Sequence, residues 1–195
     1  MLTALLLAAA VPAPPACPIE KAVYRLKGDP KFTAGFARQD RRDSAVSDLV
    51  LWLKTPKRTY WFSFGAPNGY GGTYLAPELD PRISVRLSDD KERDSAERMA
   101  TAEPLNIEFD AFRADLGAFT APPQSSDKAP SLLFARGLGP ALWYGPSALA
   151  GNDPAAEQEG MPIGLFVPAG CSGPPKQGEL PKQRELGKEE LSAIR

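Results

Sequence analysis

Residues 48–77 read DLVLWLKTPKRTYWFSFGAPNGYGGTYLAP, and this stretch decides the fold. Its first part, LVLWL at residues 49–53, is apolar on both faces of an extended strand, which predicts a central strand covered on two sides. The proline and two basic residues that follow turn the chain. The run TYWFSF at residues 59–64 suits a second strand, and the Asn68-Gly69 turn leads to a third at residues 73–75. The stretch therefore predicts a β-meander.

Alternation of apolar and polar residues predicts further strands on both sides of the meander. These strands are expected at residues 19–26, 31–36, 82–88, 105–110, 131–135, 138–144 and 163–167. Short helices are expected at residues 91–102 and, after the Asp153-Pro154 pair, up to Gly160. Together these patterns predict about nine or ten short strands and one or two short helices. We therefore expect a mainly β fold, either an antiparallel β-sandwich or a partly open barrel.

The first 16 residues, MLTALLLAAAVPAPPA, are apolar and carry no charged side chain. About ten apolar residues are too few to span a bilayer, which takes roughly twenty, but they fit the core of a secretory signal peptide. No basic residue precedes the run and prolines crowd its end, which departs from a standard signal. We expect a signal peptide over residues 1–16, one β-domain over residues 17–171 and a flexible charged tail over residues 172–195. The expected location is periplasmic or secreted, with no transmembrane segment after the signal.

The chain has two cysteines, Cys17 and Cys171. An even number of cysteines in an exported chain favours a disulfide bond between them. Cys17 directly after Ala16 also allows a lipid anchor, but Pro14 occupies the position where a lipoprotein signal usually has an aliphatic residue. The disulfide is the favoured interpretation.

The charges nearly balance, with 23 basic and 24 acidic residues and a net charge of −1. That balance argues against a nucleic-acid partner or an anionic membrane bound through bulk charge. The chain has no histidine, which excludes Ser-His-Asp and Cys-His catalysis and histidine-ligated zinc. It has no phosphate-binding glycine loop or dinucleotide motif, and the acidic cluster at residues 89–94 matches no calcium loop. No cofactor and no metal are therefore expected.

Carboxylate chemistry stays open, because a glycosidase needs only two suitably separated acids. Glu108 and Asp110 are neighbours on one strand face, and Glu78 and Asp80 lie beside another strand. The alternative is that these acids form the solvated face of an amphipathic strand, and we favour it.

Aromatic residues give the candidate binding site. Trp61 shares its strand face with Thr59 and Ser63, and a tryptophan on a polar face can stack against a sugar or peptide. Asn68, Tyr70 and Tyr74 follow next to flexible glycines and complete the candidate set. The alternative is that Trp61 belongs to a second core layer.

These observations predict an exported envelope protein of bacterial type. Its most probable role on sequence grounds is a non-catalytic binding domain for an envelope protein, a peptide or a saccharide. Two alternatives remain: a two-carboxylate envelope hydrolase, and a proteinaceous inhibitor of a secreted enzyme.

Overall fold

The structure is a computed structural model that describes residues 11–39, 46–66, 72–78, 80–81, 105–151 and 153–175. The strands are β1 (Val23–Leu26), β2 (Asp29–Arg38), β3 (Leu49–Lys54), β4 (Thr59–Gly65), β5 (Thr73–Glu78), β6 (Glu108–Phe112), β7 (Leu132–Arg136) and β8 (Phe166–Gly170). The helices are η1 (Ile19–Lys21), α3 (Leu138–Tyr144) and α4 (Pro146–Leu149). The expected strand at residues 82–88 and the expected helix at residues 91–102 lie outside the described residues. So do most of the expected signal peptide and tail.

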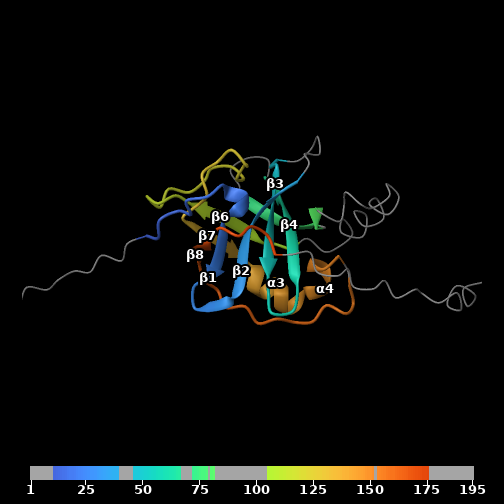
Figure 1. Cartoon of the computed structure of the whole chain (residues 1–195). Helices are drawn as coiled ribbons and strands as arrows, with labels where there is room; N and C mark the ends of the chain where they lie inside the picture. Colours follow the sequence, from blue (N-terminus) through green and yellow to red (C-terminus); the bar gives the residue numbers. More distant parts are fainter. Residues whose placement is uncertain are drawn as a thin grey trace, which may run out of the picture.

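The strands form one closed barrel (Figure 1). Each strand pairs antiparallel with the next in the sequence, and β8 returns to pair with β1. The mainly β fold is confirmed, and the described residues hold eight strands in place of the nine or ten expected. Closure leaves no free sheet edge, which removes the main route by which exposed strands aggregate.

The meander of β3, β4 and β5 is confirmed, and its register explains both apolar faces of β3. Leu49, Leu51 and Leu53 point into the barrel and join the main core. Val50 and Trp52 point outward and belong to a second buried cluster on the outside. Because successive side chains of a strand point to opposite faces, β3 is covered on both sides as its sequence predicts.

Aromatic rings fill the barrel interior. Phe36 contacts three of them: its ring centroid is 6.1 Å from that of Tyr24, 6.3 Å from that of Phe64 and 6.5 Å from that of Phe109. An eight-stranded barrel is just wide enough for its own side chains to fill. The interior is therefore a packed core, and any binding surface must be sought on the outside.

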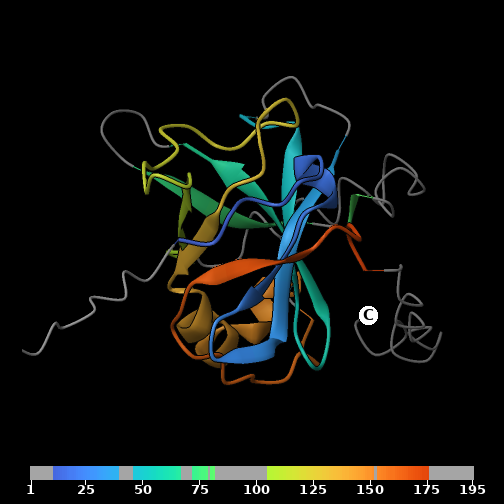
Figure 2. The ribbon, with the colours of Figure 1, turned by 60° about the vertical axis from the view of Figure 1, so that its left-hand side comes forward.

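Helices α3 and α4 lie at one end of the barrel (Figure 2). The expected strand at residues 138–144 is wrong, because this segment is α3. Gly137 adopts φ +85°, which ends β7, and the buried Leu138, Ala141 and Leu142 then follow helical spacing. Pro140 fits because the first helical turn needs no backbone donor there. Among the described residues, no helix is both long and apolar enough to cross a membrane.

The segment after α4 also differs from expectation. No helix forms at residues 153–160; the Asp153 carboxylate accepts a hydrogen bond from the Ala155 amide and makes a single turn. Further on, the Glu159 amide donates to the carbonyl of Leu142, which ties this extended segment to α3. The last strand is displaced along the chain, since residues 163–165 precede β8 (Phe166–Gly170).

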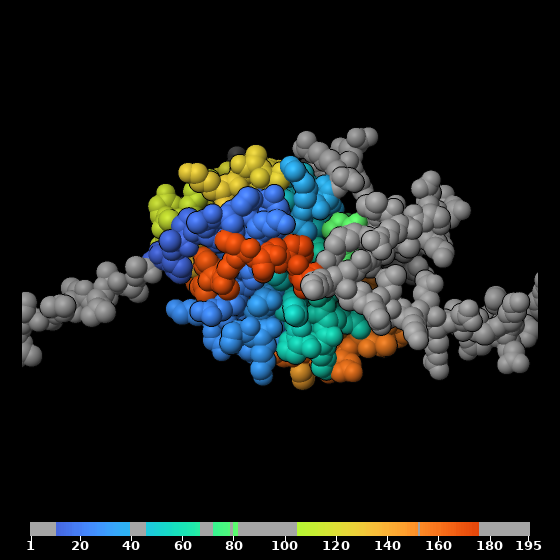
Figure 3. Space-filling view, viewed as in Figure 1, coloured from blue at the N-terminus to red at the C-terminus, as the bar shows by residue number. Residues whose placement is uncertain are grey.

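The predicted disulfide bond is present. Cys17 and Cys171 are bonded, with their Cα atoms 6.1 Å apart and a sequence separation of 154. Beside it, the Gly173 amide donates to the Lys21 carbonyl at 2.9 Å. In Figure 3 the red C-terminal segment accordingly lies between two blue N-terminal segments on this face of the molecule.

Candidate functional site

Trp61 is buried, with 5% of its surface exposed, and it lies against Trp52 in the outer cluster with Ala37 and Val50. The burial of Trp61 corresponds to the alternative drawn from the sequence, in which Trp61 belongs to a second core layer. The reason is the neighbouring strand, because Trp52 is the direct cross-strand partner of Trp61 and covers it. A binding role for Trp61 stays a prediction, and it would require the outer cluster to open.

Tyr74 is the exposed member of the predicted set, at 42%. Its ring lies over Gly65, its cross-strand partner, where a Cβ atom would fall 2.0 Å from the tyrosine Cζ. Gly65 and Trp61 are four residues apart on β4, which separates Tyr74 from Trp61 by about 13 Å along the strand. Asn68 and Tyr70 lie outside the described residues. Of the four predicted residues, the two that the structure describes, Trp61 and Tyr74, therefore do not lie side by side.

The candidate acids on β6 have a structural role. Glu108 is the cross-strand partner of Arg136 on β7, and its carboxylate lies 2.8 Å from that guanidinium. Both side chains are about half exposed, as on the solvated face of an amphipathic strand. This pairing supports the structural interpretation of Glu108 over the catalytic one.

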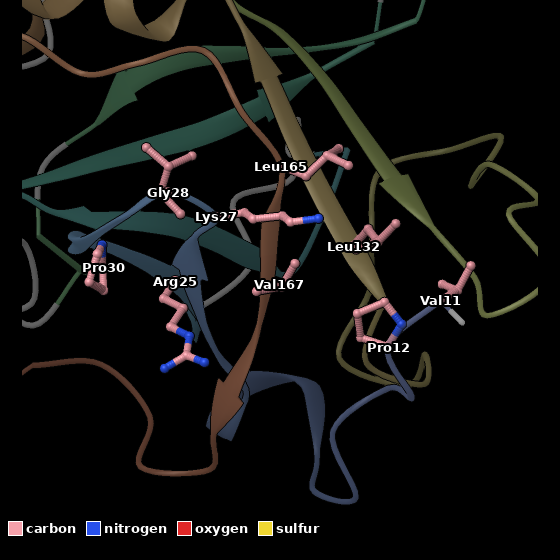
Figure 4. Close-up of a pocket in the computed structure, with 10 residues that line it drawn as sticks. Val11, Pro12, Arg25, Lys27, Gly28, Pro30, Leu132, Leu165 and Val167 are labelled. Carbon is pink, nitrogen blue, oxygen red and sulfur yellow. The ribbon is translucent and has the colours of Figure 1, made fainter. Parts of the chain in front are cut away.

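A groove on the outside of the barrel is the feature that the sequence did not reveal (Figure 4). It lies where the barrel is most weakly closed, because β7 and β8 pair only at Leu133 and Phe166. Its volume is about 670 Å³, within the roughly 300–1,000 Å³ usual for small-ligand sites. The lining residues are Val11, Pro12, Arg25, Leu26, Lys27, Gly28, Pro30, Leu132, Leu165 and Val167.

The charges of this groove are all positive. Arg25 on β1 and Lys27 in the turn after it are exposed and line the groove, and no acidic residue is among the lining side chains. Within the described part of the chain, neither side chain makes an ion pair or a hydrogen bond. In Figure 4 the Lys27 side chain runs between Leu165 and Val167, with its ammonium group directed across the groove. The groove therefore offers unpaired cations beside an apolar floor.

Barrel closure places these residues together. Arg25 of β1 is the cross-strand partner of Val167 of β8, and the Lys27 amide donates to the Leu165 carbonyl at 2.8 Å. The alternation of buried Tyr24 and Leu26 with exposed Arg25 and Lys27 is visible in the sequence and runs from β1 into the turn that follows it. The apolar residues Leu165 and Val167 lie near the other end of the chain, and no local sequence pattern links them to Arg25 and Lys27.

A second recess lies under the loop between β6 and β7, and two of its three charged side chains, Arg113 and Asp127, are already engaged. Arg113 donates to the Ala118 carbonyl at 3.0 Å, and its guanidinium carbon lies 4.9 Å from the centre of the Phe119 ring. Asp127 accepts a hydrogen bond from the Gln124 amide at 2.8 Å. These contacts fix the loop, so this recess offers less to a charged ligand than the groove does.

A buried polar cluster lies at the helical end of the barrel. Glu159 is 5% exposed, and its carboxylate accepts hydrogen bonds from the hydroxyls of Thr55, at 2.7 Å, and Tyr60, at 3.5 Å. Burial, and then the neighbouring Glu159 carboxylate, raise the pKa of Tyr60 to about 12. With the Arg58–Asp153 ion pair at 3.1 Å, this cluster fastens the segment after α4 to the turn between β3 and β4.

Known proteins give no guide to the function. Comparison of the chain with protein-family models, with curated proteins and with solved structures found no match. Among the described residues, no three histidine, cysteine or acidic side chains are grouped so that they could hold a metal ion.

Proposed function

We propose that this chain is an exported, non-catalytic binding domain whose ligand site is the groove between β7, β8 and β1. The observation that carries the proposal is the groove itself: about 670 Å³ on the outside of a filled barrel, with Arg25 and Lys27 unpaired at its rim. Charged groups left without partners beside an apolar surface are the usual means by which a protein orients a ligand.

Binding is favoured over catalysis by the side chains that line the groove. The charged side chains that line the groove are one arginine and one lysine, which are residue types that recognise anions. No carboxylate lines the groove, and the pair that a glycosidase requires is absent from it. The groove therefore supplies recognition by charge and apolar contact, with no general base.

Export is the second part of the proposal. The apolar residues at the start of the chain fit a secretory signal, and disulfide bonds such as Cys17–Cys171 form in oxidising compartments. Processing near residues 10–17 would remove Val11 and Pro12 from one wall and leave the other eight lining residues. The intact mass of the protein from its native host tests this part, and a mass that includes Met1 would contradict it.

A fluorescent dye tests the groove. Anilinonaphthalene sulfonate, which brightens in apolar sites, should bind the folded protein saturably and at one site. Val167→Glu places a carboxylate opposite Arg25, where it should form a cross-strand ion pair and abolish dye binding. The matched control is Ala169→Glu, which adds the same charge at an exposed position of β8 outside the groove and should leave binding unchanged. Absence of dye binding, or equal binding by the two variants, would overturn the assignment.

A further inference from the structure

We infer that the ligand of the groove is a single-chain amphiphile with an anionic head group, such as a long-chain carboxylate. This inference rests on the proposed function and adds the chemical class of the ligand. Its basis is the division of the groove into a cationic part, which comes from the end of β1 and the turn after it, and an apolar part, which other segments contribute.

The cationic part selects for a negative head group. Arg25 on β1 and Lys27 in the turn that follows it both line the groove, so an anion held there is attracted by two cations. Their like charges repel each other, and no described acidic side chain offsets them. An anion bound between them would receive charge-assisted hydrogen bonds from both.

The apolar part selects for a hydrocarbon chain. Leu132, Leu165 and Val167 form a continuous apolar surface next to the cations, with Pro30 at one end of the groove. Leu165 is 38% exposed, so its side chain is accessible to a ligand in the groove. A hydrocarbon chain lying here would cover this surface, whereas a saccharide would leave its hydroxyls against groups that cannot accept or donate hydrogen bonds.

The shape of the site argues against a large partner. The groove is bounded by Gly28 in the turn between β1 and β2 and by Pro30 at the start of β2, and its volume of about 670 Å³, which includes the wall of Val11 and Pro12, suits one small molecule. A diacyl lipid within a bilayer would have to present two chains. A free fatty acid and a lysophospholipid share the required chemistry, namely one chain and one anionic head.

The experiment is a dye-displacement titration below the micelle concentration, with laurate, dodecanol, lysophosphatidylglycerol and lysophosphatidylcholine as competitors. The two anionic amphiphiles should displace the dye at least about tenfold more tightly than their uncharged or zwitterionic counterparts, because each head-group contact is charge-assisted. If laurate is the only competitor that displaces the dye, the site prefers a carboxylate head group. If lysophosphatidylglycerol is the only one, the site prefers a phosphodiester. Either result supports a single-chain anionic amphiphile as the ligand.

A pair of charge-matched variants identifies the cations responsible. Arg25→Gln with Lys27→Gln should reduce the preference for laurate over dodecanol to about one. Lys31→Gln with Lys54→Gln removes the same charge from exposed positions outside the groove and should keep the preference. If the dye binds the groove but dodecanol competes as well as laurate, the ligand class is wrong while the binding site stands. If the dye does not bind at all, the proposed function itself fails.

Discussion

Trp52 and Trp61 are direct cross-strand partners on β3 and β4, and both indoles lie buried on the outside of the barrel, at 2% and 5% exposure. The Trp52 indole nitrogen also donates to the Phe36 carbonyl at 3.2 Å, which fixes its ring across β2. The barrel thus has a second core on its outer face, and both tryptophans are buried in it.

Trp61→Ala should lower the free energy of unfolding by about 3–5 kcal/mol, because it removes a buried aromatic side chain and leaves a cavity beside Trp52. Guanidinium unfolding followed by circular dichroism measures this loss. Tyr144→Ala is the control, since Tyr144 is 84% exposed and the change should stay within about 0.5 kcal/mol. A small loss for Trp61→Ala together with lost binding to a glycan or peptide array would restore Trp61 as a surface contact residue.

Gly35→Ala should destabilise the protein by about 1–3 kcal/mol through overpacking. A Cβ atom on Gly35 would fall 2.5 Å from the Ala22 carbonyl oxygen and 2.6 Å from Cζ2 of Trp52, so one of them must move. Gly170→Ala on β8 is the matched control, because a Cβ atom there meets nothing within 4 Å. Equal melting temperatures for the two variants would show that the indole of Trp52 does not occupy the space above Gly35.

Replacing Cys17 and Cys171 together by serine should cost about 2–5 kcal/mol. The bond closes a loop across 154 residues, and in the chain-entropy treatment long loops restrict the unfolded chain most. Urea unfolding of the oxidised protein and of the double variant gives the difference. Addition of a reductant should lower the stability of the wild type to that of the variant and leave the variant unchanged. If the reductant does not change the stability of the wild type, the disulfide bond does not contribute to it.

Stability should fall at alkaline pH through the buried tyrosines. Burial raises the pKa of Tyr24 and brings that of Tyr60 to about 12, whereas an unfolded tyrosine has a pKa of about 10. Their contribution is therefore fully present below about pH 10 and is lost as the pH rises towards the folded-state values. In that window, each tyrosine lowers the free energy of unfolding by up to about 1.4 kcal/mol per pH unit.

Urea unfolding at a series of pH values measures this alkaline slope. Tyr60→Phe should make the slope shallower by the amount that one tyrosine contributes to it, since phenylalanine has no proton to lose. Tyr144→Phe is the control and should leave the slope as it is, because the Tyr144 side chain is largely in solvent. An unchanged slope in Tyr60→Phe would mean that the Tyr60 hydroxyl is solvated in the folded state.

Strand positions could be predicted wherever side chains alternate, because the two-residue period of a strand is a local property of the chain. The alternation of Phe32, Ala34 and Phe36 in β2 correctly marked an inward face. The segment at residues 138–144 was not predictable in this way. Its apolar residues suit a strand or a buried helix turn, and the left-handed conformation of Gly137 together with packing against the barrel end decided for the helix.

The sequence by itself determined the mainly β fold, the meander and the pairing of its two cysteines, since these follow from local periodicity and from the presence of only two thiols. Only the tertiary structure decided that the sheet closes, that Trp52 covers Trp61, and that Arg25 and Lys27 lie beside Leu165 and Val167. The physical reason is that a strand's own residues set which side chains share a face, whereas its neighbours set what that face meets. Here the neighbour of β1 is β8, about 140 residues further along the chain, and closure between them creates the groove.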